Sequence, residues 1–150
     1  MLALARKDLF FYCHLKAPDF YKKNRQYLID LCNELQDFRK SDYDILVVKE
    51  PPRNGKSRTA QLLVEWSLGS DNSLKIMTGS YNETVATQFS KGVRNSIQEE
   101  KAEEDKLVYS DIFPGVSIKE GDGAANLWSL EGGYTNYLAT SPTGTATGFG

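Results

Sequence analysis

The nine residues from Glu50 to Arg58, with the sequence EPPRNGKSR, constrain the fold of this chain more than any other stretch. Residues 43–49 before them are apolar and rich in β-branched side chains, which predicts a strand buried on both faces. Residues 59–68 after them carry apolar side chains at helical spacing. A strand, a tight loop with Gly-Lys-Ser and a helix are the setting of a phosphate-binding P-loop. We therefore expect a P-loop at this junction.

The loop residues have separate expected roles toward ATP and Mg²⁺. Backbone N–H groups at a helix start lack intrahelical acceptors, and the helix dipole adds positive charge, so both favour a polyphosphate. Gly55 lets the phosphate approach, Lys56 reaches the β- and γ-phosphates, and the Ser57 hydroxyl is the expected Mg²⁺ ligand. The turn around Phe20 is expected to support the adenine ring. The predicted nucleotide-binding residues are Pro52, Arg53, Asn54, Gly55, Lys56, Ser57, Arg58 and Phe20.

The loop departs from the usual pattern G-x-x-x-x-G-K-[ST]. Glu50 stands at the position of the first glycine, and Pro51 and Pro52 stiffen a loop that usually relies on glycine. The alternative interpretation is an ordinary strand, turn and helix, with Asn54 as the helix cap.

Length and composition fit one soluble globular domain. The chain has 150 residues, and no stretch approaches the roughly 18 apolar residues of a membrane span. Cys13 and Cys32 are too isolated for a metal site and are expected to be free thiols in a reducing cytoplasm. A net charge of −2 argues against a free-standing nucleic-acid clamp.

The pattern divides the chain into three parts. Residues 1–42 form a helical segment, with helices expected over 2–15 and 21–38. Residues 43–106 form a strand–helix–strand–helix core. Its second strand, 73–78, is expected to run parallel to the first, and its second helix to begin at a capping box from Ser80 to Glu83. Residues 107–150 are rich in glycine, and a hairpin is predicted over 126–130 and 134–138.

Several stretches resemble the large terminase subunit of tailed bacteriophages. Residues 47–57, VVKEPPRNGKS, resemble the arginine-containing Walker A motif of that family. Residues 78–84, TGSYNET, and 89–95 look like its second strand and following helix. Residues 133–150 are similar to the segment before its Walker B strand, and residues 8–10 and 17–20 fit its opening. The chain thus resembles the front of a terminase ATPase domain.

This resemblance implies a fold, an activity and partners. The implied fold is an ASCE-type P-loop NTPase, a three-layer α/β/α domain with a largely parallel sheet that is incomplete at its C-terminus. The implied activity is ATP-driven translocation of double-stranded DNA into a procapsid, with Lys56 and Arg53 as catalytic residues and Arg53 responding to the γ-phosphate. The implied partners are a portal protein, a small terminase subunit and further copies in a ring, in the cytoplasm of a bacterial host and without a membrane.

One part of the family pattern is missing from the sequence. We find no apolar run ending in the Walker B aspartate and glutamate, and no nuclease carboxylates. We therefore expect a partial ATPase domain without the nuclease domain. Two alternatives are another P-loop enzyme, such as a helicase-like ATPase or a small-molecule kinase, and a nucleotide- or DNA-binding module without turnover.

Overall fold

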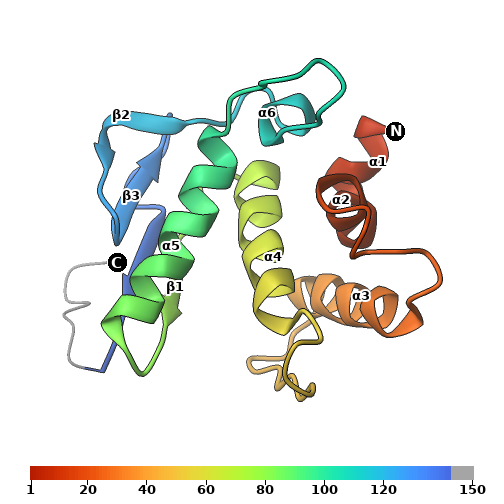
Figure 1. Ribbon diagram of the computed structural model, residues 1–150. Coiled ribbons are helices and arrows are strands. Elements are labelled where there is room, and N and C mark those ends of the chain that lie inside the picture. The colour runs from red at the N-terminus through yellow and green to blue at the C-terminus, as the bar shows by residue number, and fades with distance from the viewer. Residues whose placement is uncertain (143–150) are drawn as a thin grey trace.

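Helices occupy one side of the molecule and a small sheet the other (Figure 1). The computed structural model describes residues 1–142. Helix α5 (Glu83–Gln98) packs on the sheet, α4 (Lys56–Ser70) packs on α5, and the first two helices pack on α4. The other helices are α1 (Leu2–Lys7), α2 (Leu9–Lys16), α3 (Gln26–Lys40) and α6 (Tyr109–Ile112).

The sheet is mixed, so the expected three-layer fold with a largely parallel sheet is wrong. Its strands β1 (Ile76–Gly79), β2 (Ile118–Gly123), β3 (Leu127–Leu130) and β4 (Tyr137–Thr140) lie in the order β1-β4-β3-β2. Among the strands of residues 1–142, only β1 and β4 pair in parallel, with Ile76 opposite Tyr137. The β2–β3 and β3–β4 pairs are antiparallel. Connections of a few residues between β2, β3 and β4 can join only antiparallel neighbours, because a parallel pair needs a long crossover.

The stretch expected as the first buried strand, residues 43–49, has no regular secondary structure and belongs to no sheet of the described residues. Tyr43, Ile45 and Val47 are 81%, 80% and 70% exposed, while Leu46 and Val48 are half-buried beside α3. The prediction of a strand buried on both faces is therefore wrong, and so is the prediction that the strand at residues 73–78 runs parallel to it. β-branched composition favours an extended backbone, but it does not supply a partner strand.

The helices agree better with the sequence than the sheet does. The helix expected over 2–15 is divided at Asp8, whose carboxylate accepts a 2.8 Å hydrogen bond from the backbone N–H of Phe11 and caps α2. Helix α5 is capped by Asn82 rather than by the predicted box from Ser80, because the Asn82 side chain accepts from the backbone of Thr84 at 2.7 Å. The predicted hairpin is confirmed as β3 and β4. Residues 143–150, the end of the glycine-rich part, lie outside the described residues.

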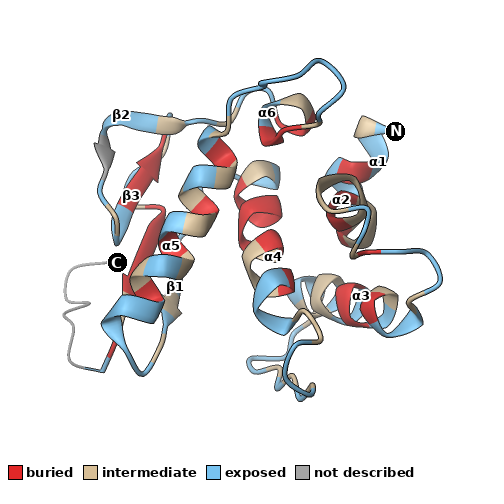
Figure 2. Cartoon of the chain, viewed as in Figure 1, coloured by how far each residue is buried: buried red, intermediate tan, exposed pale blue. Residues whose placement is uncertain are grey.

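Buried residues gather where α4 and α5 face their neighbours (Figure 2). Between α5 and the sheet, the ring of Trp128 stacks on that of Tyr137 at a centroid distance of 4.8 Å, and its indole N–H donates to the Ser90 hydroxyl at 3.1 Å. The Asn136 amide donates to the carbonyl oxygens of Asn72 and Leu74, which fixes the start of β4 beside the start of β1. Within residues 1–142, no helix is both long and apolar enough to cross a membrane.

Candidate functional site

The start of α4 carries positive charge and no side-chain cap. Gly55, with φ of +81°, precedes the helix, and the N–H of Thr59 makes its first helical hydrogen bond, 2.8 Å to the Gly55 carbonyl oxygen. The backbone N–H groups of residues 56–58, in the first turn of α4, therefore have no intrahelical acceptor. Lys56 and Arg58 stand in this first turn, which has no acidic residue. Cations at the positive end of a helix dipole are unfavourable by themselves, so this helix start is suited to an anion.

The aromatic ring of Phe20 packs against the loop at Gly55. A Cβ at Gly55 would lie 2.5 Å from Cε1 of Phe20, so the ring packs directly against the Gly55 backbone. The guanidinium groups of Arg25 and Arg58 lie over the same ring, 5.1 and 5.3 Å from its centroid. The expected contact between Phe20 and adenine stays a prediction. In the structure the Phe20 ring packs against the loop at Gly55 and lies under the Arg58 guanidinium group.

The loop itself forms a turn on the surface. The Lys56 ammonium donates to the Glu50 carbonyl oxygen at 3.2 Å and so joins the two ends of the loop. Arg53 is exposed and has a left-handed backbone with φ of +67°, which is uncommon for a residue other than glycine. Pro52 is also exposed, and Asn54 is half-buried.

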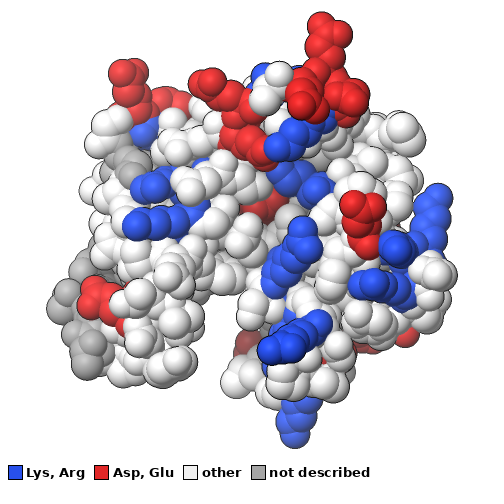
Figure 3. Space-filling model, viewed as in Figure 1, with Lys and Arg blue, Asp and Glu red and all other residues white. Residues whose placement is uncertain are grey.

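A cleft of about 400 Å³ separates the start of α4 from β1 and α5. Figure 3 shows it as a deep notch, with Lys and Arg side chains on the α4 side and few charges on the other. This volume is in the range of small-molecule sites. The described residues that line it are Lys56, Ser57, Ala60, Thr78, Gly79, Ser80, Val85, Ala86 and Phe89.

The floor of the cleft is the carboxyl end of β1, which pairs in parallel with β4. Ser80, which follows β1, donates its backbone N–H to the Thr140 carbonyl oxygen at 3.1 Å. The Thr78 hydroxyl is hydrogen-bonded to the phenol of Tyr137, and burial raises the pKa of Tyr137 to about 12, so the phenol keeps its proton at neutral pH. The carboxyl end of parallel strands is where ligands bind in α/β sheets.

The structure brings together only part of the predicted site. Lys56 and Ser57 line the cleft, Gly55 caps the helix, and Arg58 lies on Phe20. Pro52, Arg53 and Asn54 are absent from the lining formed by the described residues. Two other parts of the lining were not predicted from the sequence: the floor at Thr78, Gly79 and Ser80, and the opposite wall with Val85 and Phe89 of α5. The predicted strand over residues 73–78 was the available signal, because residues just after a parallel strand are candidates for a site.

In the cleft the described residues offer Mg²⁺ hydroxyl groups rather than a cage of carboxylates. Residues 1–142 contain no group of three His, Cys, Asp or Glu that could hold a metal. The Ser57 hydroxyl in the cleft fits the way Mg²⁺ binds with nucleotides, where phosphates and waters supply most of the coordination. Such an ion would enter the cleft together with a polyphosphate.

Comparisons with protein families, with curated proteins and with solved structures found no match to this chain.

Proposed function

We propose that this protein binds ATP with Mg²⁺ in the cleft between α4 and β1. Lys56 and the free N–H groups of the first turn of α4 hold the β- and γ-phosphates, and the Ser57 hydroxyl ligates Mg²⁺. The Lys56 ammonium leaves the Glu50 carbonyl oxygen when it turns to the phosphates, and a charged phosphate is a stronger acceptor than a neutral carbonyl.

One observation carries this proposal. The first turn of α4 is cationic and has no side-chain cap, and it faces a ligand-sized cleft at the carboxyl end of β1. A polar cap and acidic residues in the first turn stabilise a helix start, and a bound polyphosphate can supply the same stabilisation. α4 has Gly55 as its cap residue, with Lys56 and Arg58 in that turn.

We further propose, from the resemblance of residues 47–57 and 78–95 to large terminase subunits, that this ATP site belongs to a viral DNA-packaging motor. In that role the protein acts in the cytoplasm of a bacterial host, as one copy of a ring on the procapsid. Its partners are double-stranded DNA, a portal protein and a small terminase subunit. The ATP site can be tested alone, before any partner is added.

Isothermal titration calorimetry with MgATP tests the site. Lys56→Ala removes the only ammonium group that lines the cleft among the described residues. We expect it to weaken binding by about 2–3 kcal/mol, the range of a hydrogen bond to a charged group. Ser57→Ala should weaken MgATP binding more than binding of ATP without Mg²⁺, because it removes the metal ligand.

Lys119→Ala is the matched control for this titration. It also removes one exposed lysine, but from β2, at the opposite edge of the sheet from β1. Its affinity for MgATP should equal that of the wild type. Equal affinities of wild type, Lys56→Ala and Lys119→Ala would overturn the proposed site.

A further inference from the structure

The two walls of the cleft differ in chemistry. The α4 wall presents Lys56 and Ser57, whereas the α5 wall presents Val85, Ala86 and Phe89. Such a division fits a ligand with a charged half and a flat apolar half. ATP is such a molecule, with its phosphates at one end and its base at the other.

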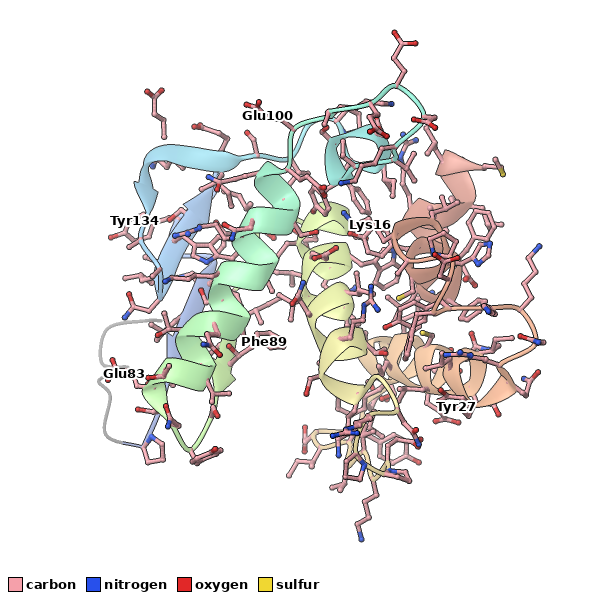
Figure 4. The ribbon with its side chains drawn as sticks, viewed as in Figure 1. Lys16, Tyr27, Glu83, Phe89, Glu100 and Tyr134 are labelled. Carbon is pink, nitrogen blue, oxygen red and sulfur yellow. The ribbon has the colours of Figure 1, made fainter. Side chains whose placement is uncertain are left out.

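The α5 wall is apolar and accessible. Val85 is 42% exposed and Phe89 is partly buried, one helical turn further along α5. In Figure 4 Phe89 lies on the side of α5 that faces α4. Residues four apart share a helix face, so Val85 and Phe89 form one continuous surface. Their successors on the same stripe, Val93 and Ile97, are buried in the core.

Phe20, the aromatic residue expected to support the adenine ring, already has other contacts. The Phe20 ring carries the Gly55 backbone and two guanidinium groups, those of Arg25 and Arg58. A base stacked on Phe20 would have to displace at least one of them. Phe89 carries no cation over its ring among the described residues.

We propose that the base of the bound nucleotide lies against Val85 and Phe89 of α5, across the cleft from the phosphates on α4. This inference rests on the proposed function and assigns the second half of the same ligand. The ribose then lies over the floor, beside the hydroxyls of Thr78 and Ser80. A Cβ at Gly79 would meet only the Thr140 carbonyl oxygen, at 4.0 Å, so the missing side chain keeps this floor open.

Binding of MgATP and of Mg-tripolyphosphate, measured by calorimetry, tests the inference. Tripolyphosphate has the charged half of ATP and no base. Phe89→Ala should weaken ATP binding about tenfold, within the range of base stacking on an aromatic side chain, and leave tripolyphosphate binding unchanged. Val85→Ser should also weaken ATP binding and leave tripolyphosphate binding unchanged. Because Val85 is exposed, this variant should not disturb the packing of the core. Lys56→Ala should weaken both ligands.

Two control variants complete the experiment. Gln88→Ala alters an exposed residue of α5 outside the lining and should bind both ligands like the wild type. Phe20→Ala should show no selective loss of ATP. A selective loss in Phe20→Ala, or wild-type ATP affinity in both Phe89→Ala and Val85→Ser, would overturn the inference while leaving the proposed function intact. The inference would also be overturned if Phe89→Ala and Val85→Ser each lost as much affinity for tripolyphosphate as for ATP. If the wild type binds neither ligand, the proposed function fails and this inference with it.

Discussion

Tyr12 of α2 and Glu65 of α4 meet inside the core, where the phenol donates a 2.5 Å hydrogen bond to Oε1 of the carboxyl group. Both side chains are fully buried. The Ser96 hydroxyl of α5 donates to the same oxygen at 3.0 Å, and the Tyr109 phenol of α6 donates to the Glu65 backbone carbonyl at 2.8 Å. Glu65 therefore joins four helices and lies on the same helix as Lys56.

We predict that this contact makes stability depend on pH. Burial raises the pKa of Glu65 to about 7, although Lys16 and the hydrogen bonds from Tyr12 and Ser96 lower it. A raised carboxyl pKa means that the folded state holds a proton which the unfolded state has lost. Stability should therefore fall as pH rises from 4.5, the ordinary pKa of a glutamate side chain, to about 7, by at most about 3 kcal/mol from this group. Urea unfolding at a series of pH values measures this fall.

Glu65→Gln isolates the contribution of this one carboxyl group. Glutamine keeps the shape and an acceptor oxygen for Tyr12 and Ser96, but it does not ionise. The variant should match the wild type at about pH 4, where the folded and unfolded states both hold the Glu65 proton, and exceed its stability at about pH 9, after Glu65 has lost its proton. Tyr12 does not disturb the comparison, because burial raises its pKa well above 10. Identical pH profiles of the two proteins would contradict the prediction.

The second prediction concerns Gly55 and Phe20. Alanine at position 55 meets a left-handed backbone and two atoms of the Phe20 ring within 2.6 Å. The backbone alone should cost about 1–2 kcal/mol in unfolding free energy, and displacement of Phe20 should add to it. Gly115→Ala is the matched control, because a Cβ there has no neighbour within 4 Å. In the double variant with Phe20→Ala, the added cost should disappear and the backbone cost should remain.

The sequence predicted the helices better than the sheet because helix signals are local. The stripe with Leu28 and Leu31 in α3, and the one with Val93 and Ile97 in α5, were visible as spacings of three and four, and these residues are buried. Residues 43–49 had the composition of a strand, but pairing depends on a neighbour that composition does not reveal. The parallel partner of β1 is β4, about sixty residues away.

The same limit applies to the candidate site. Lys56 and Ser57 could be named because their motif is contiguous, and both line the cleft. Val85 and Phe89 could not be named as site residues from the sequence, because they continue the apolar stripe of Val93 and Ile97 and so have the pattern of core residues. In the first two turns of α5 the residues of this stripe line the cleft instead of being fully buried. The boundary between core and cleft depends on how α4 packs on α5, which the sequence does not show.

A third prediction is that Arg53 distinguishes ATP from ADP. Its left-handed backbone is costly for arginine, and such outliers often occur at functional sites. A guanidinium group suits a phosphate geometrically, so Arg53→Ala should weaken ATP binding about tenfold and ADP binding less. Calorimetry with both nucleotides measures the difference. An equal loss for ATP and ADP would reduce Arg53 to a general electrostatic contributor.

The last prediction is that this 150-residue chain binds ATP without hydrolysing it at a useful rate. Phosphoryl transfer needs a group that orients the attacking water, and the described residues that line the cleft include no carboxylate. Lack of a general base typically costs about 10²–10⁴-fold in rate. Phosphate release by the purified chain should therefore equal that of Lys56→Ala, which serves as the blank. Turnover of about one per second, in the ordinary range of enzymes, that is lost in Lys56→Ala would contradict the prediction and show that a group able to orient water reaches the cleft.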